Sequence, residues 1–177
     1  MTTFIRRVFG ALGLDPATFE DVEADRSATG QAVLVVLLAS IGAGLGNTDL
    51  GSSAPRIIVV AAAASILAWA TWAGLIYYLG TRVLPDRDTR ADFGEVFRTL
   101  GFAAAPGMFR AFEVFGNTRW FVLPLTSLWM IVAMTIGVRQ ALDYRTTTRA
   151  VALALLGWGV AMGMAIVVGT LLSTPVS

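Results

Sequence analysis

The chain alternates between long stretches without any charged residue and short segments that carry nearly all of its charge. Four windows contain no Asp, Glu, Lys or Arg: residues 27–48, 57–81, 120–138 and 150–177. A helix needs about 20 consecutive apolar residues to cross a bilayer, so each window is long enough for one crossing. Backbone polar groups in lipid must be satisfied within the segment, so these spans must be helical. The pattern predicts an all-α, polytopic membrane helix bundle.

A fifth stretch, residues 93–115, has an apolar centre but carries charges near both ends. Only residues 99–109 are free of charge, and Pro106 interrupts a regular helix because it removes a hydrogen bond and clashes with the preceding turn. Arginines near helix ends extend to the lipid headgroups, so a crossing is physically admissible. The charge pattern alone leaves both four and five spans open.

The charged residues of this stretch share one face of an ideal helix. Within an arc of about 120° lie two opposite-charge pairs at i,i+3 spacing, Glu95 with Arg98 and Arg110 with Glu113. One interpretation is a polar stripe, bent at Pro106, that faces the bundle interior and binds an anion, a lipid headgroup or a partner. The other, which we favour, is two ion pairs that anchor the ends of a short span at the membrane interfaces.

Residues 1–26, called the leader below, are amphipathic and acidic. Phe4, Val8 and Leu12 fall on one arc of a helical wheel, and Arg6 and Arg7 fall on the other. This pattern is typical of a short helix that lies at the membrane interface, with its apolar side chains in lipid and its arginines toward anionic headgroups.

The second half of the leader begins with a helix-start signal. Asp15 followed by Pro16 is a common pairing of an N-cap residue with the first residue of a helix. The acidic run at residues 19–25 lacks the ligand spacing and the glycine of a calcium loop, so we do not expect a metal site there. We interpret the run as a solvated helix face just outside the bilayer.

Small residues spaced four apart mark helix faces that can approach closely. Gly42 with Gly46 and Gly159 with Gly163 are of this kind. We expect such pairs to pack spans against one another within the chain, because a bundle of four or five spans needs several close contacts.

The composition supports a membrane protein and limits its chemistry. Of the 177 residues 56% are hydrophobic and 14% are charged, whereas soluble domains carry about 25% charged residues. The net charge of +1 argues against nucleic-acid binding. The chain has no histidine and no cysteine, so it lacks the commonest metal ligand, the usual general base and any thiolate. We therefore expect no enzymatic activity, no metal and no cofactor.

All 13 basic residues are arginines, and their distribution predicts an orientation. With five spans and a cytoplasmic N-terminus, only Arg56, Arg110 and Arg119 fall outside, which leaves ten arginines on the cytoplasmic side. With four spans, nine arginines lie on the cytoplasmic side and four lie outside. The positive-inside rule thus places the N-terminus in the cytoplasm without deciding the number of spans.

Two stretches resemble the membrane domain of the Yip family, which is named for interaction with Ypt/Rab GTPases. They are "ADFGEVFRTLGFAAAPGMF" and "VRQALDYRTTTRAVALALLG", the second being similar to the family's link between its fourth and fifth spans. The resemblance covers roughly residues 27–172. It implies five spans, at about 27–48, 57–81, 93–115, 120–138 and 150–172. The matching positions are Phe93, Arg98, Gly101, Phe102, Ala103, Pro106, Arg139, Gln140, Ala141, Asp143, Arg149 and Ala150.

Eukaryotic members of that family act in vesicle traffic at the Golgi and the endoplasmic reticulum through a long cytosolic N-terminal region. The leader here spans only residues 1–26, so we do not expect GTPase binding. A compact chain whose basic residues are all arginine resembles a prokaryotic member. We therefore expect a multi-pass protein of a bacterial inner membrane, with the N-terminus in the cytoplasm and the C-terminus outside.

The expected function is a non-enzymatic one, as a scaffold or adaptor that organises a membrane through lipid or protein contacts. Its expected partners are the lipid bilayer and either a membrane protein or a second copy of the chain. The alternative is a small transporter or channel component with a polar path along residues 93–115.

Overall fold

A computed structural model describes residues 3–47, 55–86, 89–115 and 117–173. All regular structure within these residues is helical, which confirms the all-α class. The elements are α1 (Thr3–Leu12), α2 (Pro16–Ala24), α3 (Ala28–Asn47), α4 (Pro55–Tyr78), the π-helical turn η1 (Leu79–Val83), α5 (Phe93–Ala103), the 3-10 helix η2 (Ala105–Val114), α6 (Arg119–Ala141) and α7 (Thr147–Ser173).

Three helical stretches are long and apolar enough to cross a membrane. They are Ala28–Leu45 in α3, Ala63–Val83 in α4 and η1, and Arg119–Ala141 in α6. A shorter stretch of α7, Thr147–Val160, is also apolar. The chain is therefore a multi-pass membrane protein. That α7 and residues 93–115 also cross the membrane stays a prediction.

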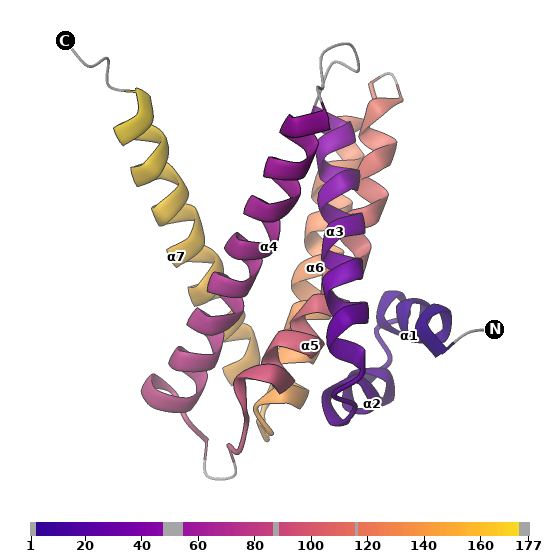
Figure 1. The fold of residues 1–177 in the computed structure, drawn as a ribbon. Coiled ribbons are helices and arrows are strands. Elements are labelled where there is room, and N and C mark those ends of the chain that lie inside the picture. The colour runs from indigo at the N-terminus through magenta and orange to yellow at the C-terminus, as the bar shows by residue number, and fades with distance from the viewer. Residues whose placement is uncertain (1–2, 48–54, 87–88, 116, 174–177) are drawn as a thin grey trace.

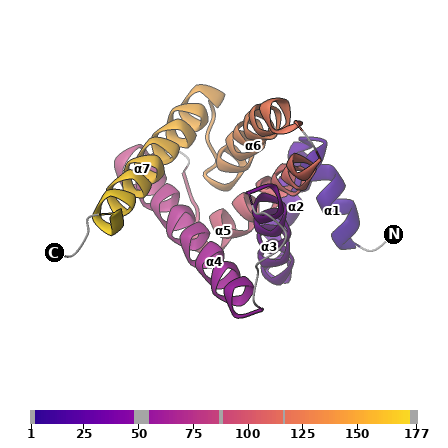
Figure 2. The same ribbon diagram turned by 90° about the horizontal axis from the view of Figure 1, so that it is seen from above.

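The long helices alternate in direction, and α7 slants across α4 and diverges from the other helices toward its C-terminal end (Figure 1). Helices α5 and η2 follow each other along the bundle. Seen from above, α4 and α7 lie on one side and α3 and α6 on the other, with α5 between them (Figure 2). Helix α5 contacts α2, α3, α4 and α6. The leader helices α1 and α2 pack beside the lower part of the bundle, so α5 is the element on which the leader and the spans meet.

Helix α5 begins at a capping box. The Asp92 carboxylate accepts a hydrogen bond from the Glu95 backbone N–H at 2.9 Å, and the Glu95 carboxylate accepts one from the Asp92 N–H at 2.7 Å. Two backbone donors at the helix start are thus satisfied reciprocally. From Val96 to Ala103 nearly every α5 residue is buried.

Helix α5 ends sooner than the sequence suggested. We expected one kinked helix over residues 93–115, but the α-helix stops at Ala103 and the chain continues as the 3-10 helix η2. Pro106 explains the change, because its ring would clash with the carbonyl of residue 102 in an α-helix. In a 3-10 helix the side chains at i and i+3 eclipse each other. The ideal wheel that placed all four charges on one stripe therefore does not describe this segment.

The contact between α3 and η2 depends on a glycine. A Cβ atom at Gly42 would lie 2.7 Å from the Met108 carbonyl oxygen and 3.0 Å from that of Gly107. The prediction that Gly42 packs helices within the chain is confirmed. Gly159 and Gly163 make no such close contact with the described residues, because a Cβ atom at either position would meet no atom of them within 4 Å.

We expect Gly42→Ala to lower the free energy of unfolding by about 1–3 kcal/mol, because the added methyl group overpacks the contact with η2. Gly44→Ala is the matched control on the same helix: its Cβ meets nothing within 4 Å, so stability should be unchanged or slightly raised. Helical circular dichroism of both variants during denaturation in detergent micelles measures the difference. Equal stabilities of the two variants would contradict the close contact.

Candidate functional site

The leader folds back as a helical hairpin whose turn is set by Asp15. Helix α2 begins at Pro16, and the Asp15 carboxylate accepts hydrogen bonds from the Ala17 N–H at 3.2 Å and the Thr18 hydroxyl at 2.8 Å. The residue before it, Leu14, has a positive φ of 59°. The predicted start of the second helix is confirmed.

Arg7 joins α1 to α2 and α3 through a buried guanidinium. Its side chain donates to Asp21 at 2.9 Å, to Asp25 at 2.8 Å and to the Gln31 amide oxygen at 3.2 Å, and the residue is only 3% exposed. The prediction that Arg7 faces lipid headgroups is therefore wrong. Arg6 remains exposed and forms only a peripheral ion pair with Asp21 at 3.3 Å.

The electrostatics of this cluster favour its charged form. The hydrogen bond from Arg7 lowers the pKa of Asp21 against the opposing effect of burial. Hydrogen bonds from the Ser27 side chain, from Arg7 and from the Ser27 backbone lower the pKa of Asp25 to about 2. Both carboxylates therefore stay ionised at neutral pH, and Arg7 is neutralised by Asp21 on α2 and by Asp25, the residue that follows the helix.

The apolar face of α1 lies on protein. Phe4, Val8 and Leu12 pack against the core, and the Phe4 ring meets the Phe102 ring edge to face at 6.4 Å. These three side chains are partly buried against protein, a contact that the sequence did not predict, because a wheel shows which residues share a face but not what that face meets. Ile5 and Phe9 remain exposed instead, Phe9 by 63%.

The second buried guanidinium of the leader contact belongs to Arg98. Its Nε donates to the Val22 carbonyl at 3.1 Å and its Nη2 donates to the Glu23 carbonyl. These carbonyls belong to the last turn of α2, where helix carbonyls lack partners within the helix. Arg98 thus caps α2 rather than forming the predicted ion pair with Glu95, whose carboxylate is used in the capping box.

A polar pocket of about 320 Å³ opens where the leader meets the end of α6. Burial raises the pKa of Glu23 to about 7, helped by the negative charges of Asp143, Glu95 and Glu20 and opposed by Arg98. The pocket is therefore rich in carboxylates, one of which titrates near neutral pH. Its walls are Glu20 and Glu23 from α2, with Arg139, Gln140, Asp143 and Tyr144 from α6 and the turn after it.

The turn between α6 and α7 is held by the second stretch that resembles the Yip family. Asp143 adopts a positive φ of 51°, which reverses the chain after α6. The Arg139 guanidinium donates to the Tyr144 carbonyl at 3.3 Å, and the Tyr144 hydroxyl donates to the Leu84 carbonyl at 2.7 Å. Desolvation raises the pKa of Tyr144, so the hydroxyl stays a donor. These residues fasten the turn to the segment that follows α4.

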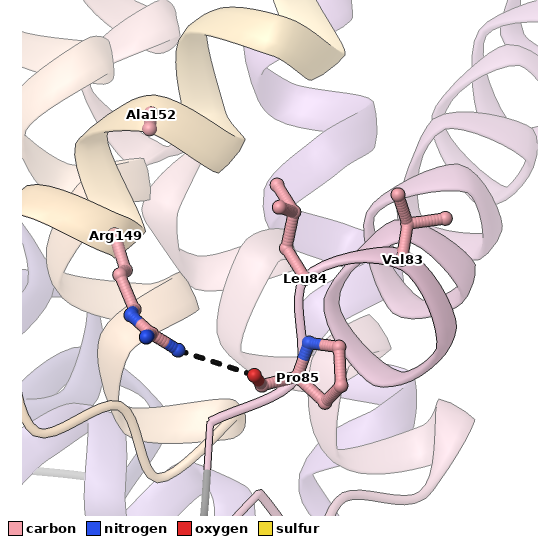
Figure 3. A pocket seen from close by; sticks show the side chains of 5 residues that line it. All are labelled: Val83, Leu84, Pro85, Arg149 and Ala152. Atoms are coloured by element: carbon pink, nitrogen blue, oxygen red, sulfur yellow. Dashed lines mark hydrogen bonds between the residues drawn. The ribbon is translucent and has the colours of Figure 1, made fainter.

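Arg149 makes a parallel connection at the start of α7. Its Nη1 donates to the Pro85 carbonyl at 3.1 Å (Figure 3) and lies 3.4 Å from the Asp86 carboxylate. A cavity of about 320 Å³ lies beside it, lined also by Val83, Leu84 and Ala152. Arg149 therefore connects the start of α7 to the segment after η1 at the rim of a small cavity.

The remaining charges of the predicted stripe lie toward the other end of the bundle. Arg110 pairs with Glu113 at 2.8 Å, as predicted, and Arg119 lies 3.8 Å from the same carboxylate. The buried residues between Arg98 and Arg110 are apolar apart from Thr99. The stripe is thus two separate clusters, and this arrangement does not favour a polar path along the segment.

The carboxylates that bind Arg7 belong to the acidic run, for which the sequence pattern predicted a solvated face. Phe19 and Val22 within the run are buried, and Asp21 and Asp25 bind the guanidinium. The spacing of the two aspartates by four residues was a usable signal, because residues four apart at a helix end lie near each other.

Taken together, the fold and the charged end define an all-α, multi-pass membrane protein with a docked N-terminal hairpin. The family model described as the Yip1 domain matches residues 9–169, so the chain belongs to the Yip1 domain family. This confirms the resemblance noted in the sequence. No curated protein and no solved structure matches the chain.

We expect Arg7→Gln to open the leader hairpin and to loosen its attachment to α3. Charge-assisted hydrogen bonds contribute about 1.5–3 kcal/mol each, and this contribution is smaller where the partner is partly exposed, as it is here. We therefore expect the rate of amide hydrogen exchange in α1 and α2 to rise about tenfold or more. Arg6→Gln, which removes an exposed neighbour, should leave exchange nearly unchanged. Hydrogen–deuterium exchange with mass spectrometry compares the two variants, and similar exchange in both would rule out Arg7 as the attachment.

Proposed function

We propose that this protein is a non-enzymatic organiser of the membrane, which acts through lipid and protein contacts made at the end of the bundle that carries the leader. One observation carries the proposal: two buried guanidiniums hold the leader in place. Arg98 of α5 binds the last turn of α2, and Arg7 joins the two leader helices to each other and to Gln31 of α3. A docked hairpin presents a fixed surface to a partner, which lowers the ordering cost of binding compared with a mobile tail.

Two parts of this surface have different chemistry. On α1, the exposed Ile5 and Phe9 lie one helical turn apart beside exposed Arg6, which suits the boundary between acyl chains and headgroups. The Trp129 indole donates to the Leu12 carbonyl at 3.0 Å, so α1 is attached near the middle of α6. We therefore assign the apolar part of α1 to lipid contact.

The polar pocket is the part suited to a partner. Glu20, Glu23 and Asp143 supply carboxylates and Arg139 supplies one guanidinium. Such a pocket complements a cationic side chain of a membrane protein or of a second copy of the chain. Membership of the Yip1 domain family supports a role that rests on protein contacts.

The proposal includes five crossings, with the leader on the cytoplasmic side of a bacterial inner membrane. The 11 residues of α5 and the ten of η2 extend about 35 Å at 1.5 and 2.0 Å per residue, enough for a hydrocarbon core of about 30 Å. The 3-10 geometry therefore lengthens a segment that is short of apolar residues. The distribution of the arginines supports the same orientation.

Single introduced cysteines test the crossing, because the chain has none of its own. We expect Arg90→Cys, before α5, to react with a membrane-impermeant maleimide only in inverted vesicles. Asn117→Cys, after η2, should react only from outside intact cells. Both positions are exposed, so access to the reagent is matched. Labelling of both residues from the same side would exclude the crossing by α5 and η2.

A second pair of cysteines tests the lipid contact of α1. A fluorescent probe on Phe9→Cys in reconstituted vesicles should be quenched by nitroxide-labelled lipid, because this exposed side chain points away from the protein core. The same probe on Glu20→Cys, exposed on α2 at the rim of the polar pocket, should be quenched by aqueous iodide. Quenching of the Phe9 probe by iodide alone would refute a lipid-contacting leader.

A further inference from the structure

A groove on the exposed side of η2 and α6 shares one residue with the leader contacts, Trp129, whose indole donates to the Leu12 carbonyl. It encloses about 350 Å³ and lies between aromatic and aliphatic side chains of the two helices. Four of these side chains are largely exposed, namely Phe112, Phe115, Phe121 and Leu125. A cluster of large exposed apolar side chains around a hollow is the kind of surface that binds an apolar ligand.

The floor of the groove is held in place by ring contacts. The Phe109 ring stacks on the Trp129 ring at 5.4 Å and on the Phe112 ring at 6.1 Å. The Trp129 N–H is already used in its hydrogen bond to Leu12, so the indole presents only apolar atoms to the groove. The cavity is therefore formed before a ligand enters, which reduces the entropy lost on binding.

The length of the groove matches one leaflet of a bilayer. Its lining on α6 runs from Phe121, in the first turn, to Trp129, near the middle. Eight residues of α-helix rise about 12 Å, and half of a hydrocarbon core measures about 15 Å. An acyl chain that enters from the headgroup region would therefore lie along most of the groove.

Positive charge lies at the headgroup end of the groove. Glu113, whose side chain is fully buried, lies between Arg110 and Arg119, so this cluster carries two guanidiniums and one carboxylate. Arg119 is more than half exposed and is the first residue of α6, between groove residues Phe115 and Phe121. The cluster has a net charge of +1, and the N-terminal dipole of α6 adds to it.

We propose that this groove binds one acyl chain of an anionic phospholipid, with the lipid phosphate beside Arg119. The apolar walls and the length of the groove, which matches one leaflet, suit the acyl chain of the lipid. The net positive charge of the cluster suits its anionic headgroup. The charged end of the site is far from the polar pocket, and the groove borders the leader only at Trp129 among the residues that line it, so the site extends the proposed function without depending on it.

Native mass spectrometry of the purified protein tests this site. The protein is first exchanged into micelles that contain equal amounts of phosphatidylglycerol and phosphatidylcholine. We expect the wild type to retain one phosphatidylglycerol about fivefold to tenfold more often than one phosphatidylcholine, because one charge-assisted contact gives a preference of this size. Leu125→Trp fills the groove and should abolish retention of both lipids. Arg119→Gln should keep retention but remove the preference for the anionic lipid.

Leu128→Trp is the matched control, because Leu128 is 62% exposed and Leu125 is 60% exposed on the same helix, and only Leu125 lines the groove. The Leu128→Trp variant should retain phosphatidylglycerol as often as the wild type does and with the same preference over phosphatidylcholine. Helical circular dichroism of each variant confirms that it is folded. Equal retention by the Leu125→Trp and Leu128→Trp variants would show that the lipid is merely adventitious and overturn the site. A preference that survives Arg119→Gln would overturn the assignment of the phosphate.

Discussion

The hydrogen bonds from Arg98 to the last turn of α2 are the interaction on which the arrangement of this protein depends. A buried guanidinium needs acceptors, and the carbonyls at a helix C-terminus need donors, so each satisfies the other. The bonds connect residues about 75 positions apart and fix the leader on α5. They also place the Glu23 carboxyl in the polar pocket.

Two buried charges, those of Arg7 and Glu113, are paired with side chains of opposite charge. Arg7 is neutralised by two aspartates of the leader, and Glu113 lies between two arginines. An isolated charge in a medium of low polarity costs several kcal/mol, so pairing is what permits these residues near the spans. The same pairing leaves a limited exposed surface for function: the apolar part of α1, the polar pocket and the aromatic groove.

Pro106 divides the path of α5 and η2 into two parts with different contacts. Because the α-helix stops before it, Arg98 belongs to an α-helical half that binds the leader, whereas Arg110 belongs to a 3-10 half that borders the aromatic groove. The eclipsed side chains of the 3-10 helix bring Arg110 onto Glu113 and stack Phe109 near Phe112. One proline therefore separates a polar contact surface from an apolar one along a single path through the bundle.

The amino-acid sequence by itself determined the helical class, the positions of the long apolar helices and the family, because bilayer thickness imposes a length on every span and charge marks its ends. Only the tertiary structure decided which face of α1 meets protein and which residues Arg7 and Arg98 bind. Helical periodicity reports that residues share a face and contains no information on what that face contacts. The acceptors of Arg98 are backbone carbonyls, which every residue possesses, so no side-chain pattern distinguishes them before the chain has folded.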